Sequence, residues 1–176
     1  ENFLPLEKLA QKKDVLAEAE GIKIRQVWTG SEVDNSGSIS ADGEYLSFTN
    51  WETGNLMMKN LKTGKDIQLT DETSWTKPMQ WAEGSLISPD GKQVAYVWRN
   101  DRGDKGNYEL RLIQVGTQKP TTLYFCRKDE YIIPKLWLPG NKRLIVHTFI
   151  GKDQWQLSSI DVLTGDIQLL KEKTEH

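Results

Sequence analysis

Three stretches of the sequence decide the fold: SISADGEYLSFTNW at residues 38–51, LISPDGKQVAYVW at residues 86–98, and LWLPGNKRLIVHTF at residues 136–149. Each has at least one large apolar residue near its start, continues through a turn that contains glycine, and ends in a run of mixed apolar and polar residues. Alternation with a period of two is typical of a strand that is buried on one side. Each stretch therefore predicts two antiparallel strands joined by a tight turn.

The turn residues support this prediction. In Ser88–Gly91 (SPDG), proline fixes φ, aspartate can accept hydrogen bonds from nearby backbone, and glycine tolerates a positive φ. The third stretch departs from this pattern at Leu138–Asn141 (LPGN), where Gly-Asn still favours a turn.

Two further alternating runs follow each stretch. The first runs are NLMMKNLKTG from residue 55, NYELRLIQVG from residue 107 and QWQLSSIDVLTG from residue 154. The second runs are DIQLT from residue 66, TTLYF from residue 121 and DIQLL from residue 166. Asp42 and Asp90 are 48 residues apart, and Gly140 follows Asp90 by 50. A repeat of about 50 residues that contains four strands is typical of a β-propeller blade.

The repeats resemble the TolB-type, WD40-like (PD40) β-propeller repeat. The similarity rests on SADGEYLSF at residues 40–48, SPDGKQVAYV at residues 88–97 and the strand end at Leu61–Gly64, and it covers roughly residues 22–172. The chain contains no Trp-Asp dipeptide, so it is similar to the TolB side rather than to ordinary WD40 repeats. The resemblance implies bacterial propellers that mostly bind proteins, with the periplasm favoured and the cytoplasm as the alternative. Similar repeats also gate peptidases of the prolyl oligopeptidase and tricorn types and form pectate-fragment lyases.

We expect an all-β fold with a short N-terminal helix. Residues 36–71, 84–126 and 130–172 predict three four-stranded antiparallel blades, within a propeller segment 22–173. The helix is predicted within a linker segment, residues 1–21. The segment LEKLAQKKDVLAEAE (residues 6–20) is rich in helix formers and ends at Gly21, a typical C-cap. The run IKIRQVW (residues 22–28) alternates like a strand.

The blade number predicts an incomplete propeller. Closed propellers typically contain about four to eight blades. We therefore expect either a piece of a longer chain or one half of a six-bladed pair. The sequence has no initiating methionine and no signal-peptide pattern, so we also expect a processed or cropped chain.

Composition excludes several classes of protein. The 176 residues include 23 basic and 25 acidic side chains, and this net charge of −2 argues against a dedicated nucleic-acid binder. No apolar run is long enough for a transmembrane helix, and we expect no membrane insertion. The one cysteine cannot form an internal disulfide.

Residues for catalysis are scarce. His147, His176 and Cys126 are too few for a conventional zinc site. His147 lies in a predicted strand, where we favour a structural role over that of a general base or ligand. Cys126 follows a strand end, with no base suggested nearby, and we expect a buried or half-buried thiol. The sequence has no G-x-S-x-G elbow and no phosphate-binding glycine loop. We therefore expect no enzymatic activity, no cofactor and no metal.

Residues 100–107 (NDRGDKGN) allow two interpretations. They contain an Arg-Gly-Asp tripeptide and oxygens that could bind calcium, although the spacing does not match an EF-hand. A solvated hairpin loop requires the same glycine, aspartate and asparagine residues, and we favour that interpretation.

The tryptophans give the most useful functional signal. Four lie in or at the ends of predicted strands, where packing is the expected role: Trp28, Trp51, Trp98 and Trp137. Trp75 and Trp81 lie in TSWTKPMQWAE (residues 73–83), which predicts a long loop between blades 1 and 2. Tryptophans on surface loops often contact partners, although each ring could instead pack between blades.

Propeller geometry groups these residues on one face. Loops that join the second to the third strand, and one blade to the next, emerge together; we call this the loop face. The Asp-Gly turns lie opposite. The candidate partner-binding residues on the loop face are Trp51, Trp75, Lys77, Met79, Trp81, Arg99, Asp101, Arg102 and Trp155. Mixed charges with aromatic rings suit a protein or peptide partner.

We therefore predict a non-enzymatic, protein-binding or scaffolding propeller module, either as a homo-oligomer or with further blades from a longer chain. One alternative is the substrate-gating propeller of a larger peptidase, hydrolase or sensor protein. A second alternative is a carbohydrate-binding propeller that uses tryptophan stacking.

Overall fold

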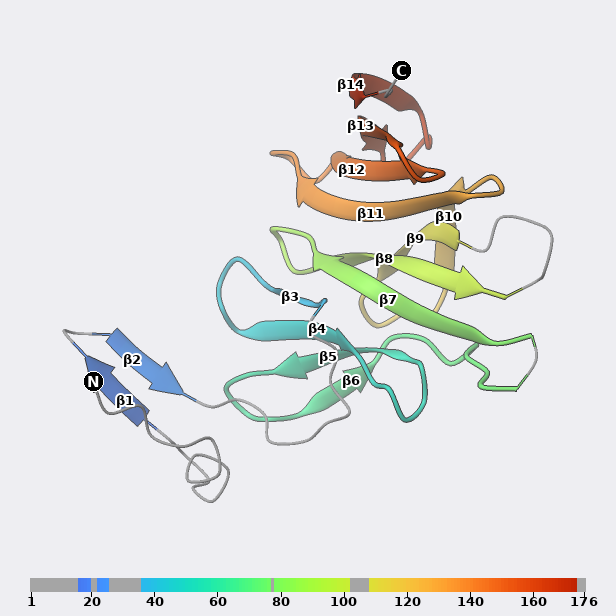
Figure 1. The fold of residues 1–176 in the computed structure, drawn as a ribbon. Helices are drawn as coiled ribbons and strands as arrows, with labels where there is room; N and C mark the ends of the chain where they lie inside the picture. Colours follow the sequence, from blue (N-terminus) through green and yellow to red (C-terminus); the bar gives the residue numbers. More distant parts are fainter. Residues whose placement is uncertain (1–15, 20–21, 26–35, 77, 102–107, 174–176) are drawn as a thin grey trace. The chain divides into compact units, whose positions relative to one another are not determined.

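The structure, a computed structural model, describes residues 16–19, 22–25, 36–76, 78–101 and 108–173 (Figure 1). The chain divides into two compact units, Glu1–Ser31 and Glu32–His176. The first contains a two-stranded sheet, and the second contains three four-stranded sheets.

In the first unit, β1 (Leu16–Ala19) pairs antiparallel with β2 (Ile22–Arg25). The predicted strand is confirmed over Ile22–Arg25, and residues 26–28 lie outside the described residues. The helix predicted over residues 6–20 is wrong at Leu16–Ala19, and the rest of it lies outside the described residues. Leucine, alanine and glutamate are good helix formers, but helix propensity is small per residue, and pairing with an alternating strand outweighs it here.

The second unit contains three antiparallel meanders, each of which we call a blade (Figure 1). Blade 1 consists of β3 (Ser38–Ile39), β4 (Tyr45–Thr49), β5 (Leu56–Asn60) and β6 (Asp66–Gln68). Blade 2 consists of β7 (Gln80–Ile87), β8 (Gln93–Asn100), β9 (Tyr108–Gln114) and β10 (Pro120–Phe125). Blade 3 consists of β11 (Glu130–Trp137), β12 (Arg143–Ile150), β13 (Gln154–Asp161) and β14 (Ile167–Lys173). The predicted all-β fold of three four-stranded antiparallel sheets is confirmed.

The turn between the first two strands is built alike in blades 1 and 2. Ser40 Oγ donates to Asp42 Oδ1 at 2.6 Å, and Ser88 Oγ donates to Asp90 Oδ1 at 2.6 Å. Each carboxylate also accepts the backbone N–H two residues further on. The serine bond, followed by that backbone bond, holds the pKa of both aspartates below its ordinary value.

The equivalent turn of blade 3 forms without serine or aspartate. Leu138 N donates to Arg143 O at 2.9 Å, which closes the hairpin at the same point as in the other blades. Gly140 and Asn141 have φ values of 87° and 57°. Asparagine tolerates this left-handed conformation better than most residues, so the backbone alone can complete the turn.

The hydrophobic core lies between the blades. One cluster joins blades 1 and 2 and includes Leu56, Met58, Val94, Tyr96 and Trp98. A second cluster joins blades 2 and 3 and includes Ala95, Leu110, Ile132, Leu144 and Ile160. Adjacent residues of β8 therefore belong to different clusters, as strand alternation requires. Blade 2 is covered on both faces.

The first strands of blades 2 and 3 each contain a β-bulge. The register shifts between Glu83 and Leu86 in β7, and between Pro134 and Leu136 in β11. The loop predicted over residues 73–83 is wrong at its end, because β7 already begins at Gln80. The bulge interrupts the period of two, which conceals the first half of β7 in the sequence.

Candidate functional site

Three tryptophans are in successive ring contact where blade 1 meets blade 2, the first pair stacked and the second tilted by 37°. The ring centroids of Trp51 and Trp75 are 6.0 Å apart, and those of Trp75 and Trp81 are 5.4 Å apart. We call these three residues the tryptophan stack. Trp51 follows β4, Trp75 lies in the segment that joins the two blades, and Trp81 lies in β7.

Backbone contacts hold the stack in place. Trp75 Nε1 donates to Glu52 O at 3.0 Å, and Thr73 Oγ1 donates to Thr53 O at 2.7 Å. Both bonds tie the segment between the blades to the loop between β4 and β5. Gly54 has a φ of 77°, and a Cβ there would lie 3.2 Å from the Trp75 ring. Glycine is therefore required for this close approach.

The stack is exposed at one end and buried at the other. Trp51 and Trp75 are 41% and 39% exposed, whereas Trp81 is only 8% exposed. The prediction that Trp81 lies on a loop is wrong, because it pairs with Arg99 in the sheet. Trp81 therefore supports the two outer rings, and those rings form the accessible surface.

Arg99 on β8 extends the stack across blade 2. Its guanidinium carbon lies 4.6 Å from the ring centroid of Trp81 and 5.3 Å from that of Tyr108. This geometry is that of cation–π contacts with two aromatic faces. Trp81 Nε1 also donates to Glu83 Oε2 at 3.2 Å, which fixes the orientation of the indole.

Further ring contacts continue into blade 3. The Tyr108 and Tyr131 centroids are 4.7 Å apart, and those of Tyr131 and Phe149 are 6.3 Å apart. His147 lies 4.1 Å from Phe149 and 5.4 Å from Trp155, centroid to centroid. Contacts between neighbouring side chains thus lead from Trp51 in blade 1 to Trp155 in blade 3.

Sequence reasoning missed Tyr108, Tyr131 and Phe149. The strand register is the signal that could have identified them. Tyr131 pairs with Phe149, and Phe149 pairs with Trp155, as Trp81 pairs with Arg99 and Arg99 with Tyr108. Blades 2 and 3 thus each carry three side chains side by side across their first three strands, at equivalent register positions.

The structure brings together part of the predicted site. Trp51, Trp75, Trp81 and Arg99 are in direct contact. Asp101 N donates to Met79 O at 2.9 Å, so these two half-buried residues are neighbours as well. Trp155 is half-buried and is linked to the others only through the ring contacts of blade 3. Lys77 and Arg102 lie outside the described residues.

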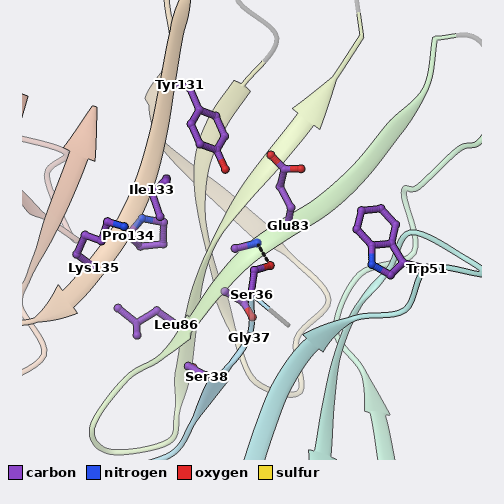
Figure 2. A pocket seen from close by; sticks show the side chains of 12 residues that line it. Ser36, Gly37, Ser38, Trp51, Glu83, Leu86, Tyr131, Ile133, Pro134 and Lys135 are labelled. Carbon is purple, nitrogen blue, oxygen red and sulfur yellow. Dashed lines mark hydrogen bonds between the residues drawn. The ribbon is translucent and has the colours of Figure 1, made fainter. Parts of the chain in front are cut away.

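A pocket of about 540 Å³ lies between the first strands of the three blades (Figure 2). We call it the axial pocket. Gly84 N donates to Ser36 Oγ at 3.2 Å across its wall. Its lining residues are Ser36, Gly37, Ser38, Trp51, Glu83, Gly84, Ser85, Leu86, Tyr131, Ile133, Pro134 and Lys135. Trp51 belongs both to this pocket and to the tryptophan stack, so the two features share a border.

The described part of the chain shows little that suits catalysis. Burial raises the pKa of the Cys126 thiol to about 12, so the thiol stays protonated at neutral pH, and Cys126 is buried as predicted. Burial, and then the charge of Lys135, lowers the pKa of His147. Among the described residues, no group of three His, Cys, Asp or Glu side chains is placed to hold a metal ion.

Within the described ranges, the chain has no helix that is long and apolar enough to span a membrane.

Three solved structures share this architecture. TolB from Acinetobacter baumannii is 20% identical, with a TM-score of 0.59, over 85% of this chain and 35% of that chain. A protein assigned as TolB from Agrobacterium tumefaciens is 12% identical, with a TM-score of 0.60, over 90% of this chain and 60% of that chain. Dipeptidyl peptidase 4 from Porphyromonas gingivalis is 13% identical, with a TM-score of 0.58, over 89% of this chain and 27% of that chain.

No protein-family model matches the chain, and no curated protein matches it. At these low identities, the similarity to solved structures shows the fold alone. That fold is the TolB-like β-propeller, which agrees with the resemblance of the repeats. The chain spans 35% and 60% of the length of the two TolB structures.

Proposed function

We propose that this chain is a non-enzymatic, PD40-type propeller module that binds a protein or peptide through its loop face. The TolB-like fold of the blades is consistent with this role. A similar fold also occurs in a peptidase, so the fold does not distinguish binding from other roles. The proposal therefore rests on the residues of the loop face.

The observation that carries the proposal is the exposed end of the tryptophan stack. The two large rings of Trp51 and Trp75 are each about two-fifths exposed, whereas the neighbouring Trp81 is buried. Tryptophan is enriched among the residues that dominate binding energy at protein interfaces. The rings are also held in place before binding, by the Trp75–Glu52 bond and by the buried Trp81. A prearranged aromatic surface loses little side-chain entropy when a partner binds.

The axial pocket indicates the shape of the partner. It begins at Trp51 and contains both an acidic side chain, Glu83, and a basic one, Lys135. An extended peptide that places an apolar side chain on the two outer rings could continue into this pocket. Mixed charges of this kind suit a peptide better than a uniformly charged polymer.

The first test removes both outer rings. Random peptides displayed on phage are selected against the purified chain, and affinity for the best peptide is measured by calorimetry. Trp51→Ala combined with Trp75→Ala should weaken binding roughly 100-fold, since two interface aromatics contribute about 3 kcal/mol together. Thermal melting by circular dichroism checks that the variant remains folded.

Phe125→Ala is the matched control. Phe125 is an aromatic residue of β10 that is 68% exposed, so its loss removes a similar surface away from the stack. Binding should stay within twofold of the unmodified chain. Unchanged affinity in the folded double variant would refute the site. Binding of glycans by the unmodified chain, lost in the double variant, would instead favour the carbohydrate-binding alternative.

A further inference from the structure

A second pocket, of about 310 Å³, lies between blades 2 and 3. We call it the interblade pocket. Residues of all four strands of blade 3 line it, together with Tyr124 on β10 and with Arg127, which follows that strand. It shares no lining residue with the axial pocket or the tryptophan stack. Its volume is close to the lower bound of about 300 Å³ for small-molecule sites.

The strand register allows the two blade interfaces to be compared position by position. Val94 pairs with Ile113 in blade 2, and Leu144 pairs with Ile160 in blade 3. All four residues belong to the buried clusters, and Val94 and Leu144 each directly follow the first turn of their blade. These two pairs are therefore equivalent, and the positions beyond them can be matched in order.

Two large side chains of blade 2 have small counterparts in blade 3. Trp98 on β8 corresponds to Thr148 on β12, and Arg111 on β9 corresponds to Ser158 on β13. Trp98 is buried between blades 1 and 2, and the guanidinium carbon of Arg111 lies 4.5 Å from the centroid of its ring. Thr148 and Ser158 both line the interblade pocket. The space that an indole and a guanidinium occupy in one interface is thus left open in the next.

The two hydroxyls in the pocket are buried and available for a ligand. Thr148 and Ser158 are 6% and 5% exposed. Within the described ranges, neither hydroxyl bonds to another residue. Buried polar groups are ordinarily satisfied by hydrogen bonds, so a molecule that occupies the pocket has two groups to bond.

Glu130 brings a buried carboxylate to the same pocket. It is 7% exposed, and its Oε2 accepts from Tyr124 OH at 3.0 Å and from Arg127 N at 2.7 Å. Burial, and then the bond to Glu130, raises the pKa of Tyr124 to about 12, so the phenol keeps its proton at neutral pH. Both bonds end on Oε2, which leaves Oε1 for a ligand.

The carboxylate of Glu130 has no cation paired with it in the described part of the chain. In the preceding interface, the buried carboxylate of Glu109 accepts from Arg111 Nε at 2.8 Å. Buried charges are ordinarily paired, because an isolated charge loses its hydration. Arg127 also lines the pocket, but it is exposed, and water screens its charge. The pocket therefore favours a ligand that carries a positive charge.

The remaining wall is aliphatic. Ile132, Val146 and Ile160 line the pocket and are each at most 1% exposed. Branched aliphatic side chains of this kind pack well against a flat ring and offer it no competing polar group.

We propose that the interblade pocket binds a small aromatic amine, with its ring beside Thr148 and Ser158 and its ammonium group bonded to Glu130. The ring takes the place that Trp98 has in the preceding interface. The ammonium group supplies the positive charge that Arg111 supplies there. The size of the pocket suits one bicyclic ring with a short amine chain.

This proposal is independent of peptide binding at the loop face. Since the two sites share no residue, the variant Trp51→Ala with Trp75→Ala should bind the amine as the unmodified chain does. The two proposals can therefore fail separately.

The experiment measures the binding of tryptamine to the purified chain by isothermal titration calorimetry. We expect one saturable site per chain. Agmatine carries positive charge without a ring, and indole-3-propionate carries the ring with a negative charge. Both should bind at least roughly tenfold more weakly than tryptamine, because each lacks one of the two contacts.

Glu130→Gln tests the role of the carboxylate. Glutamine keeps an oxygen that can accept from Tyr124 and from the Arg127 backbone, but it removes the negative charge. Tryptamine affinity should fall roughly 10- to 100-fold, as expected for the loss of a hydrogen bond to a charged group. Glu44→Gln is the matched control, because Glu44 is an exposed glutamate of the first turn in blade 1, and its affinity should stay within twofold.

Thr148→Trp tests the location of the ligand. An indole at this position should occupy the pocket as Trp98 occupies the preceding interface, and tryptamine binding should disappear. Circular dichroism checks that each variant remains folded. If Thr148→Trp does not fold, Glu130→Gln decides, because it preserves the shape of the side chain.

Four outcomes would overturn the proposal. The first is the absence of saturable tryptamine binding at millimolar concentration. The second is an unchanged affinity in folded Glu130→Gln or Thr148→Trp. The third is an agmatine affinity equal to that of tryptamine. The fourth is the loss of tryptamine binding in the double variant of Trp51 and Trp75, which would place the amine on the tryptophan stack.

Discussion

At the scale of single residues, the aspartates of the first turns link stability to pH. The pKa of Asp90 is lowered in the folded chain by the bond from Ser88 and then by the bond from Lys92 N. A carboxyl whose pKa is lower when folded contributes stability above its unfolded pKa of about 4. That contribution is lost as pH falls through the lowered folded pKa.

Asp90→Asn should therefore make stability less sensitive to acid. The asparagine oxygen can still accept the two hydrogen bonds, but it carries no charge to titrate. We expect urea midpoints of the unmodified chain to fall more steeply between pH 5 and about pH 3 than those of the variant. Equal slopes in the two proteins would show that Asp90 contributes nothing to acid unfolding.

At the scale of elements, β7 shows why the sequence prediction was correct in part. Its last two residues, Leu86 and Ile87, lie in the stretch whose alternation and turn residues predict a strand, and the predicted blade 84–126 includes its second half. Its first half was interpreted as a loop, because Gly84 and the bulge shift the alternation by one residue. The helix prediction was wrong at Leu16–Ala19 for a different reason. The residues of this segment prefer a helix, and pairing with β2 makes it a strand.

Gly84 provides a test of the bulge. Its φ is 53°, and an added Cβ would lie 3.6 Å from Val97 Cγ2, an ordinary contact. Gly84→Ala should thus destabilise the chain through backbone strain alone, by about 1–2 kcal/mol in urea unfolding. Gly84→Asn should cost less, because asparagine adopts positive φ more readily. An alanine variant as stable as the unmodified chain would contradict the assigned backbone conformation.

At the scale of the whole molecule, each blade depends on its neighbour. Among the described residues, blade 2 contributes to both core clusters, as in repeat proteins whose units contact the units next to them. The candidate site also depends on contacts between neighbouring blades. Trp75 could be selected from the sequence because it lies in a connecting segment, whereas Tyr108 and Tyr131 become neighbours only when blades 2 and 3 pack together.

Leu144→Ala should reveal this organisation. Leu144 is fully buried in the cluster between blades 2 and 3, and its truncation should cost about 2–5 kcal/mol. Hydrogen exchange followed by mass spectrometry should show faster exchange in β11–β14 than in β4 and β5. Equal acceleration in all blades would indicate that the three blades unfold as one unit.

The bulges of β7 and β11 also have a consequence for aggregation. Both strands lie at the border of their sheets, where unpaired backbone groups could recruit a strand from another molecule. A bulge twists that border and interrupts its hydrogen-bonding pattern, and Pro134 removes one donor from β11. The opposite border of blade 3 is β14, which is exposed throughout and carries Lys171 and Lys173 among its apolar residues. We therefore expect backbone shape at one border, and charge at the other, to oppose fibril-like growth.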